Sequence, residues 1–418
     1  MENVAVKIRS ITLKSYKCFE DVDISCVRED DTICQWTILL GNNNTGKTSL
    51  LKAIANLRPV LFKRITGNKV ALSQDIQNKE YIPAIIYDKE SLAELRDNSL
   101  VGCSIVAEKT IPWSYDKVKA TVTRNSDMER FYIYGYGVSR YPSKTSLSES
   151  LCDNCASLFS SDQRLINIEE WLMQLDYAAK NDKPMADSRL YRIKELLCGN
   201  LFPEILDFKF ESSDALHNYT LFQTKDGWFR YTQLGYGYQS MLSWIVDLCK
   251  RMFERYPESE NPLQESAVVL VDEIDLHLHP KWQRDIIPFL SGVFPNIQFI
   301  VTTHSPLVIQ SMSDVNLYVL HREGDKVLAE RSSVSNFKGW TVEEILRDTM
   351  RLESDIHSDE YQEYIKLFDQ GLDQHDKEKV CAAYNVLCRI LHPGSSLRRL
   401  LELQLSQMSD NDKTESDR

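Results

Sequence analysis

Residues 41–48 read Gly41-Asn42-Asn43-Asn44-Thr45-Gly46-Lys47-Thr48 and follow the apolar run Trp36-Thr37-Ile38-Leu39-Leu40. The pattern G-x-x-x-x-G-K-[ST] between a strand and a helix is a P-loop, in which backbone N–H groups at a helix N-terminus hold phosphates. The two glycines permit the tight path of the loop, and asparagine tolerates left-handed backbone better than most residues. We therefore predict that residues 41–48, together with Ser49, bind the phosphates of a nucleotide.

Two distant segments end with the polar groups that such a site needs. Residues 268–273 read Val268-Val269-Leu270-Val271-Asp272-Glu273, and residues 299–304 read Phe299-Ile300-Val301-Thr302-Thr303-His304. Each is a run of apolar residues typical of a buried parallel strand, followed by carboxylates or an imidazole. Because three matched segments complete one site, nucleotide binding is the favoured interpretation.

The expected roles follow from the chemistry of each side chain. Thr48 and Asp272 are the predicted ligands of Mg²⁺, since this ion prefers hydroxyl and carboxylate oxygens. Lys47 is expected to contact the β- and γ-phosphates, Glu273 to polarise the attacking water, and His304 to reach the γ-phosphate or that water. The alternatives are a helix cap or ion pair for the two carboxylates, and an ordinary core or surface group for a single histidine. ATP and Mg²⁺ are the predicted ligands.

Two shorter motifs invite a metal-site interpretation. His277 and His279 are separated by one residue, and Cys152 and Cys155 by two. Neither pair has further ligands at a suitable spacing, so a structural or interface loop and ordinary cysteines are the favoured interpretations.

Composition limits the class of protein. The chain has 418 residues, 43% of them hydrophobic, which suits one large or two ordinary globular domains. Its net charge of −12 excludes a molecule-wide basic field for nucleic acid, although a local basic patch is compatible with it. No stretch approaches the ~18 apolar residues of a membrane span, and residues 1–7 lack the apolar core of a signal peptide. A cytoplasmic location with ten reduced cysteines is therefore expected, with no membrane contact.

The pattern of apolar residues predicts an α/β fold with a mixed central sheet, an inserted subdomain of helices and strands, and a C-terminal helical region. A glycine-containing segment, 234–240, is expected to precede an apolar helix at 241–248. The predicted parts are an ATPase core at 1–60 and 230–335, an insertion at 61–229, a helical region at 336–408 and a disordered tail at 409–418. Within the helical region four helices are expected, at 342–353, 358–372, 376–391 and 396–407.

Together these segments resemble the ATP-binding-cassette ATPases, and within them the RecF, SMC and OLD-like branch, which is also AAA_21-like. Residues 41–48 are similar to its G-x-N-N-x-G-K-[ST], residues 272–283 to its D-E-x-x-x-x-L-H-P-x-W-Q, and residues 302–306 to its T-T-H-S-P. The matching blocks, 1–57 and 230–310, make up about a third of the chain. Within the branch, the chain is most similar to the PtuA-type ATPases of Septu antiphage systems and some retrons.

The resemblance implies a dimer in which a signature segment of one head contacts the γ-phosphate held by the other. Residues 234–239 would be that segment, with Gly237 at the nucleotide. Gly235 stands where the family has its signature serine, so hydrolysis is expected to be slow, or ATP to be sensed only. The implied partners are a second copy of the chain and an HNH nuclease of the PtuB kind. As in retrons, a reverse transcriptase with its msDNA is an alternative partner.

Three functions are weighed at this point. The first is an ATPase that regulates a partner nuclease in phage defence, because the ATPase segments come without a visible effector. The second is a RecF-like repair ATPase that contacts DNA through a basic stripe such as Lys63-Arg64 or Arg398-Arg399. The third, a transporter subunit, is disfavoured by the His-Pro-x-Trp loop and by the missing signature serine.

Overall fold

The computed structural model describes residues 6–416 except 62–64, 67–68, 71–79, 107–108, 118, 120, 126, 144–152, 200–201, 215–217 and 353–356. The chain divides into two compact units, Met1–Ile345 and Leu346–Arg418. The boundary therefore falls ten residues after the expected start of the helical region at 336. None of the described helices is both long enough and apolar enough to cross a membrane.

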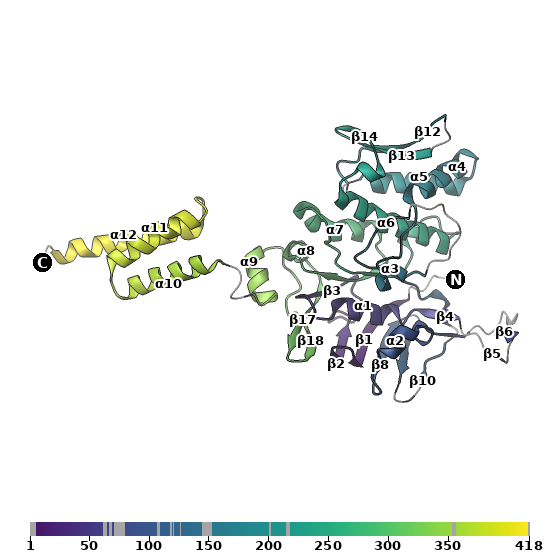
Figure 1. The fold of residues 1–418 in the computed structure, drawn as a ribbon, viewed down its shortest axis with the longest axis horizontal. Coiled ribbons are helices and arrows are strands. Elements are labelled where there is room, and N and C mark those ends of the chain that lie inside the picture. The colour runs from purple at the N-terminus through teal and green to yellow at the C-terminus, as the bar shows by residue number, and fades with distance from the viewer. Residues whose placement is uncertain are drawn as a thin grey trace. The chain divides into compact units, whose positions relative to one another are not determined.

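A six-stranded mixed sheet forms the centre of the larger unit (Figure 1), in the order β11-β15-β16-β3-β17-β18. All neighbours pair in parallel except β17 and β18, which form an antiparallel hairpin. Every residue of β3, β15 and β16 is buried, which explains why these strands read as continuous apolar runs. The strands are β3 (Trp36–Gly41), β11 (Ile133–Tyr136), β15 (Val268–Val271), β16 (Gln298–Thr303), β17 (Asn316–Glu323) and β18 (Lys326–Arg331). The expected α/β fold with a mixed sheet is confirmed.

A second, antiparallel sheet lies below the first and encloses α1 (Lys47–Ala55) between them (Figure 1). One continuous core joins the two sheets through α1, with members such as Leu13 of β1, Leu50 of α1 and Leu270 of β15. The helix that carries the P-loop lysine is thus fixed from both sides. The strands, in sheet order, are β10 (Thr121–Val122), β9 (Thr110–Asp116), β8 (Leu100–Val106), β1 (Lys7–Tyr16) and β2 (Phe19–Ser25).

Helices cover the other face of the central sheet, and a three-stranded sheet lies beyond them (Figure 1). Long α6 begins at Tyr236, five residues before the predicted start at 241, so residues 236–239 of the signature segment form its first turn. The expectation failed because the glycines and tyrosines of this turn carry no helical apolar pattern. These elements are α4 (Ile168–Lys180), α5 (Pro184–Leu197), α6 (Tyr236–Arg255), α7 (Pro280–Val293), β12 (Asp207–Ser212), β13 (Asn218–Thr224) and β14 (Gly227–Arg230).

Residues 61–229, the predicted insertion, supply strands to both large sheets. In the antiparallel sheet β8 pairs with β1, and in the central sheet β11 pairs with β15. The segment is therefore part of the core of the larger unit, Met1–Ile345. The smaller elements of this segment are β5 (Ile65–Thr66), β6 (Lys69–Val70), β7 (Tyr81–Pro83), α2 (Lys89–Ala93) and α3 (Ala156–Phe159). Strand β4 (Pro59–Leu61) comes directly before it, and α8 (Pro306–Gln310) follows β16.

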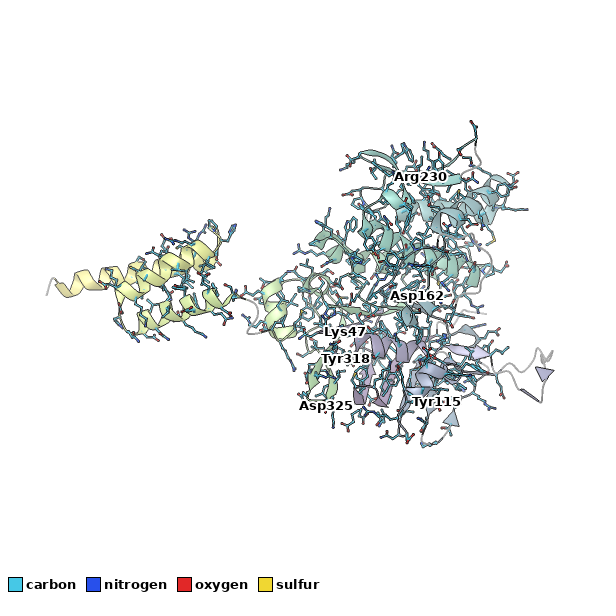
Figure 2. The ribbon with its side chains drawn as sticks, viewed as in Figure 1. Lys47, Tyr115, Asp162, Arg230, Tyr318 and Asp325 are labelled. Carbon is cyan, nitrogen blue, oxygen red and sulfur yellow. The ribbon has the colours of Figure 1, made fainter. Side chains whose placement is uncertain are left out.

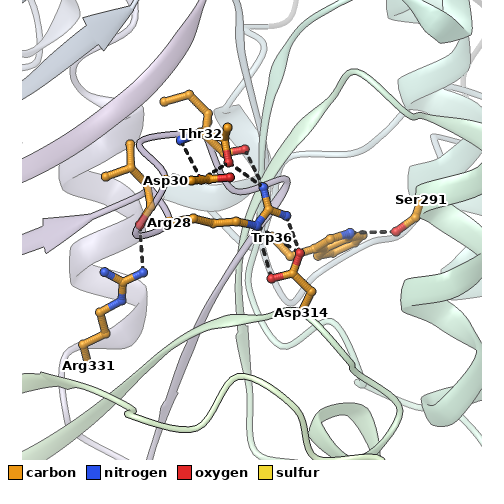
Figure 3. A network of polar contacts seen from close by, with 9 residues as sticks. Arg28, Asp30, Thr32, Trp36, Ser291, Asp314 and Arg331 are labelled. Atoms are coloured by element: carbon orange, nitrogen blue, oxygen red, sulfur yellow. Dashed lines mark hydrogen bonds and ion pairs between the residues drawn. The ribbon is translucent and has the colours of Figure 1, made fainter.

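Polar contacts fix the entrance to the P-loop strand (Figure 3). Trp36, the first residue of β3, stacks on Phe299 at 4.3 Å and donates its Nε1–H to Ser291 Oγ of α7 at 2.8 Å. Just upstream, the Arg28 guanidinium donates to both carboxylate oxygens of Asp314. These contacts set the position of β3 before it reaches the loop.

The smaller unit consists of α10 (Asp359–Asp373), α11 (Lys377–Ile390) and α12 (Ser396–Ser416), which share a small apolar core. These match the last three predicted helices, but α12 continues through most of the tail expected to be disordered; residues 417–418 lie outside the described residues. The predicted helix at 342–353 is too long. Only α9 (Val342–Glu344) and a π-helical turn at Ile345–Thr349 form there, because Arg351 adopts a positive φ of 57° that ends the helix.

Candidate nucleotide-binding site

Three neighbouring parallel strands bring the predicted site residues to one edge of the central sheet. In the register of the sheet, Val271 lies beside Val301 and Leu40 beside Thr303. The chain therefore leaves β3 into the P-loop, β15 into Asp272 and β16 into His304 at the same edge. The carboxyl ends of parallel strands are where α/β folds bind ligands.

The P-loop has the backbone shape that the sequence predicts. Asn44 has a φ of 62° and Gly46 a φ of 80°, both in the left-handed region. A side chain on Gly41 would place its Cβ 2.5 Å from the Leu320 carbonyl oxygen. Thr45 is buried and its hydroxyl donates to the Asn42 carbonyl at 2.8 Å. Asn42, Asn43, Asn44 and Thr48 form the exposed rim of the loop, and Ser49 is half-buried beside them.

Gly46 is required for both its conformation and its lack of a side chain. A Cβ at this position would lie 2.6 Å from Cys18 Sγ and 2.8 Å from Phe19 Cζ. Gly324, in the β17–β18 turn, also has a positive φ of 60° but has no atom within 4 Å of such a Cβ. We expect Gly324→Ala to cost about 1–2 kcal/mol for the backbone alone, and Gly46→Ala to cost about 1–3 kcal/mol more from overpacking. Denaturant unfolding of both variants checks this, and equal losses of stability would contradict it.

Lys47 lies inside the larger unit (Figure 2), and the P-loop holds its ammonium. The residue is buried, and its Nζ donates to the carbonyls of Gly41 at 2.7 Å and Asn42 at 2.8 Å. Burial lowers the pKa of Lys47, while the negative charges of Asp272 and Glu273 oppose that shift. The loop itself thus orients a cation where the P-loop pattern predicts a phosphate contact.

The two predicted metal ligands lie in direct contact. Thr48 donates its hydroxyl to Asp272 Oδ2 at 2.7 Å, and Thr302 donates to Asp272 Oδ1 at the same distance. One hydroxyl and one carboxylate suit Mg²⁺, which completes its octahedral shell with water and phosphate oxygens. Phosphate oxygens would be needed here, because the described part of the chain has no cluster of three histidine, cysteine or acidic residues suited to a metal ion.

The two histidines and the cysteine pair have other surroundings. The ring of His277 packs edge-on to Tyr236 at 4.5 Å, and His279 Nδ1 accepts from the Lys281 N–H at the start of α7. Cys155 is buried beneath β11, whereas Cys152 lies outside the described residues. The described members of both motifs therefore have structural contacts.

Sequence reasoning assigned no role to two residues that shape the site, Thr302 and Arg140. The Thr302 hydroxyl accepts from the Glu273 N–H at 2.7 Å, so it links the two carboxylate residues. Arg140 is buried behind them and donates to the carbonyl of Glu273 at 2.8 Å and to that of Asp272. Burial lowers the pKa of Arg140 to about 10. The signals in the sequence were the motif at 302–306, which contains Thr302, and the run at 132–140, which reads as a strand leading into a loop near the site and ends in Arg140.

His304 is half-buried at the end of β16. Burial is the main cause that lowers its pKa below the ordinary 6.5, and the charge of Lys47 lowers it further; Glu273 and Asp275 oppose the shift. At neutral pH the imidazole is therefore neutral, with one N–H to donate and one nitrogen to accept.

The lowered pKa of His304 predicts how stability depends on pH. The unfolded chain takes up a proton near pH 6.5 more readily than the folded chain does, so the folded state loses stability as pH falls through that value. His304→Gln has no such proton to take up. Melting temperatures between pH 8 and pH 5 should therefore fall more steeply for the natural chain than for the variant, and parallel curves would contradict the assignment.

The signature segment packs against the loop that follows Glu273. A Cβ on Gly237 would lie 2.6 Å from the His277 carbonyl oxygen, so glycine is needed for this close approach. Gly235, by contrast, has only the Tyr238 ring at 3.9 Å and leaves room for a side chain. The predicted contact of Gly237 with a nucleotide would require a second chain and stays a prediction.

Comparison with known proteins shows the relationships of the chain. Residues 161–310 match the family AAA_21, described as "AAA domain, putative AbiEii toxin, Type IV TA system". A Septu protein PtuA from Bacillus thuringiensis is 34% identical over 50% of this chain and 54% of its own length. The "Retron Ec83 probable ATPase" of Escherichia coli is 37% identical over 41% of this chain and 31% of its own. The chain is a relative of Septu PtuA and of the retron ATPases.

The relationship extends over nearly the whole chain. Septu protein PtuA from Bacillus mycoides is 25% identical over 94% of this chain and 52% of its own length. The resemblance predicted from residues 41–48, 272–283 and 302–306 is thereby confirmed. The chain spans about half or less of the length of these relatives. A solved SMC head domain from Thermotoga maritima covers 78% of the chain at 14% identity, but its TM-score of 0.37 is too low to add anything to the fold described above.

Proposed function

We propose that this protein is a P-loop ATPase that binds Mg²⁺–ATP at the edge of the central sheet and uses it to control a partner nuclease in antiphage defence. The observation that carries the ATPase part is the convergence of Lys47, Thr48, Asp272, Glu273 and His304 from three distant segments. The Thr48 hydroxyl donates a hydrogen bond to Asp272. Burial lowers the pKa of both Lys47 and His304, and the charge of Glu273 raises it against that burial. The names of the relatives support the same class of activity.

The residues of the chain have complementary tasks in this proposal. Lys47 and the loop N–H groups bind the phosphates, and Thr48 with Asp272 would hold Mg²⁺, which supplies charge neutralisation at the phosphates when bound. Glu273 accepts a proton from the attacking water. His304, neutral at physiological pH, donates or accepts one hydrogen bond at the γ-phosphate or that water.

The partner part of the proposal depends on the relatives and on a two-state argument. Two heads that close over two ATP molecules bind the nucleotide better when closed, so ATP shifts the population towards that state. We propose a homodimer that, when closed on ATP, fixes the activity of a bound HNH nuclease. Loss of ATP opens the dimer and releases the nuclease from this control. Of the basic stripe offered for the alternative RecF-like function, Lys63-Arg64 lies outside the described residues, and no contact in the described structure favours that function.

The test uses the purified chain with and without the HNH protein from the same cells. We expect Mg²⁺-dependent release of phosphate from ATP, no cleavage of DNA by the chain alone, and nuclease activity of the mixture that changes with added ATP. Cleavage of DNA by the chain alone would contradict the regulatory proposal. Absence of both ATP binding and phosphate release would contradict the ATPase proposal itself.

A further inference from the structure

Arg140 is a buried cation that the predicted chemistry does not use. Arg140 is 3% exposed. Its three hydrogen bonds in the described structure all go to backbone carbonyls, those of Gly137, Asp272 and Glu273. Its Nη1 is buried with no hydrogen-bond partner in the described structure. No carboxylate lies within ion-pair distance of Arg140 among the described residues, although the charges of Asp272, Asp275 and Glu273 favour its charged form. Burying a charge in this way is costly, so stability alone does not account for an arginine here.

The carbonyls that Arg140 holds belong to the two carboxylate residues of the site. Glu273 has a positive φ of 49°, in the left-handed region that few residues other than glycine and asparagine adopt without cost. Its N–H is fixed by Thr302 and its carbonyl by Arg140, so the strained residue is restrained on both sides. A residue keeps such an unfavourable backbone conformation only where contacts with its surroundings hold it there.

The arginine reaches this position from a rigid base. Arg140 Nε donates to the Gly137 carbonyl at 2.9 Å, which closes the loop after β11 on itself. A Cβ on Gly137 would lie 2.2 Å from the Ser157 carbonyl oxygen, so the loop is packed tightly against the segment around α3. The guanidinium also lies over the Trp244 ring of α6, at 5.9 Å from its centre. Its planar shape can span several carbonyls at once, which a lysine ammonium cannot do equally well.

We infer that Arg140 is a positioning residue that holds the strained Glu273 backbone, and through it the Glu273 carboxylate, in place for the attack of water. This inference rests on the proposed ATPase function. It assigns to Arg140 an effect on turnover and not on the binding of ATP, because the P-loop contacts of Lys47 and Thr48 do not involve it.

The test compares Arg140→Lys and Arg140→Met in the full chain with a matched control, Arg58→Met. Arg58 is a half-buried arginine that also donates to a carbonyl, that of Ala55, and in addition pairs with Asp153; it lies beyond the end of α1 that is far from the P-loop. Steady-state kcat and KM, the Kd for Mg²⁺–ATP and the melting temperature are measured for each. We expect kcat to fall by about 10- to 100-fold in both Arg140 variants, with the Kd changed by less than about 3-fold. Arg58→Met should lower the melting temperature and leave kcat per folded molecule unchanged.

The outcomes separate the inference from the proposed function. Absence of both ATP binding and turnover in the natural chain overturns both, whereas ATP binding without turnover overturns this inference alone. Turnover in the natural chain with an unchanged kcat in the Arg140 variants overturns this inference alone. So does a Kd that rises in parallel with the loss of kcat, or failure of both Arg140 variants to fold, since either result would give Arg140 a purely structural role.

Discussion

Lys47→Ala is expected to remove most of the affinity of the chain for Mg²⁺–ATP. The carbonyls of Gly41 and Asn42 already orient the ammonium, so little side-chain entropy is lost when it binds a phosphate. Removing one partner of a buried, hydrogen-bonded charge pair costs about 2–5 kcal/mol, which is a rise in Kd of roughly 30-fold or more. Isothermal titration calorimetry with Mg²⁺–ATP measures it.

The matched control for this prediction is Lys52→Ala on the same helix. Lys52 is half-buried near the Phe159 ring and takes no part in the P-loop. Its replacement should leave the Kd within about 2-fold, which is within the usual effect of a surface change. Equal losses of ATP affinity in the Lys47 and Lys52 variants would show that the effect comes from α1 as a whole and not from a phosphate contact.

Glu273→Gln is expected to separate binding from turnover. The amide has nearly the shape of the carboxylate but cannot accept the proton of the attacking water, so kcat should fall by about 10²- to 10⁴-fold. ATP affinity should be kept, because the contacts of Lys47, Thr48 and Asp272 are unchanged. Phosphate release under single-turnover conditions, with nucleotide binding measured in parallel, checks both halves.

Glu254→Gln serves as the control for that prediction. Glu254 lies exposed on α6, where it pairs with Lys250, so its replacement should leave both kcat and Kd unchanged. If Glu273→Gln hydrolyses ATP at the natural rate, Glu273 is not the base, and the assignment of the site at the end of β15 is wrong.

The sequence predicted those parts of the site that lie within one contiguous motif. Residues 41–48 set their own loop conformation. The runs before Asp272 and His304 read as strands because they are mostly apolar, as expected for strands that are buried on both faces. Parallel pairing then brings three strand ends to one edge, as the register shows. These features depend on local spacing, which a single sequence displays.

The residues that sequence reasoning missed act through the backbone of other segments. Thr302 joins Asp272 to Glu273, and Arg140 binds the carbonyls of both from the loop after β11, more than a hundred residues earlier. Neither contact requires a recognisable spacing between its partners. The early start of α6 at Tyr236 was missed for a related reason, since Gly237 is selected by its packing against His277 and not by helix propensity.

The account depends most directly on where ATP binds. A crystal structure of the Glu273→Gln variant grown with Mg²⁺ and ATP measures this. We predict a γ-phosphate within hydrogen-bond distance of Lys47 Nζ, with Mg²⁺ held by Thr48 Oγ1 and an Asp272 oxygen directly or through one water. A nucleotide bound elsewhere on the chain, or a P-loop whose lysine still binds only its own carbonyls beside bound ATP, would contradict the account.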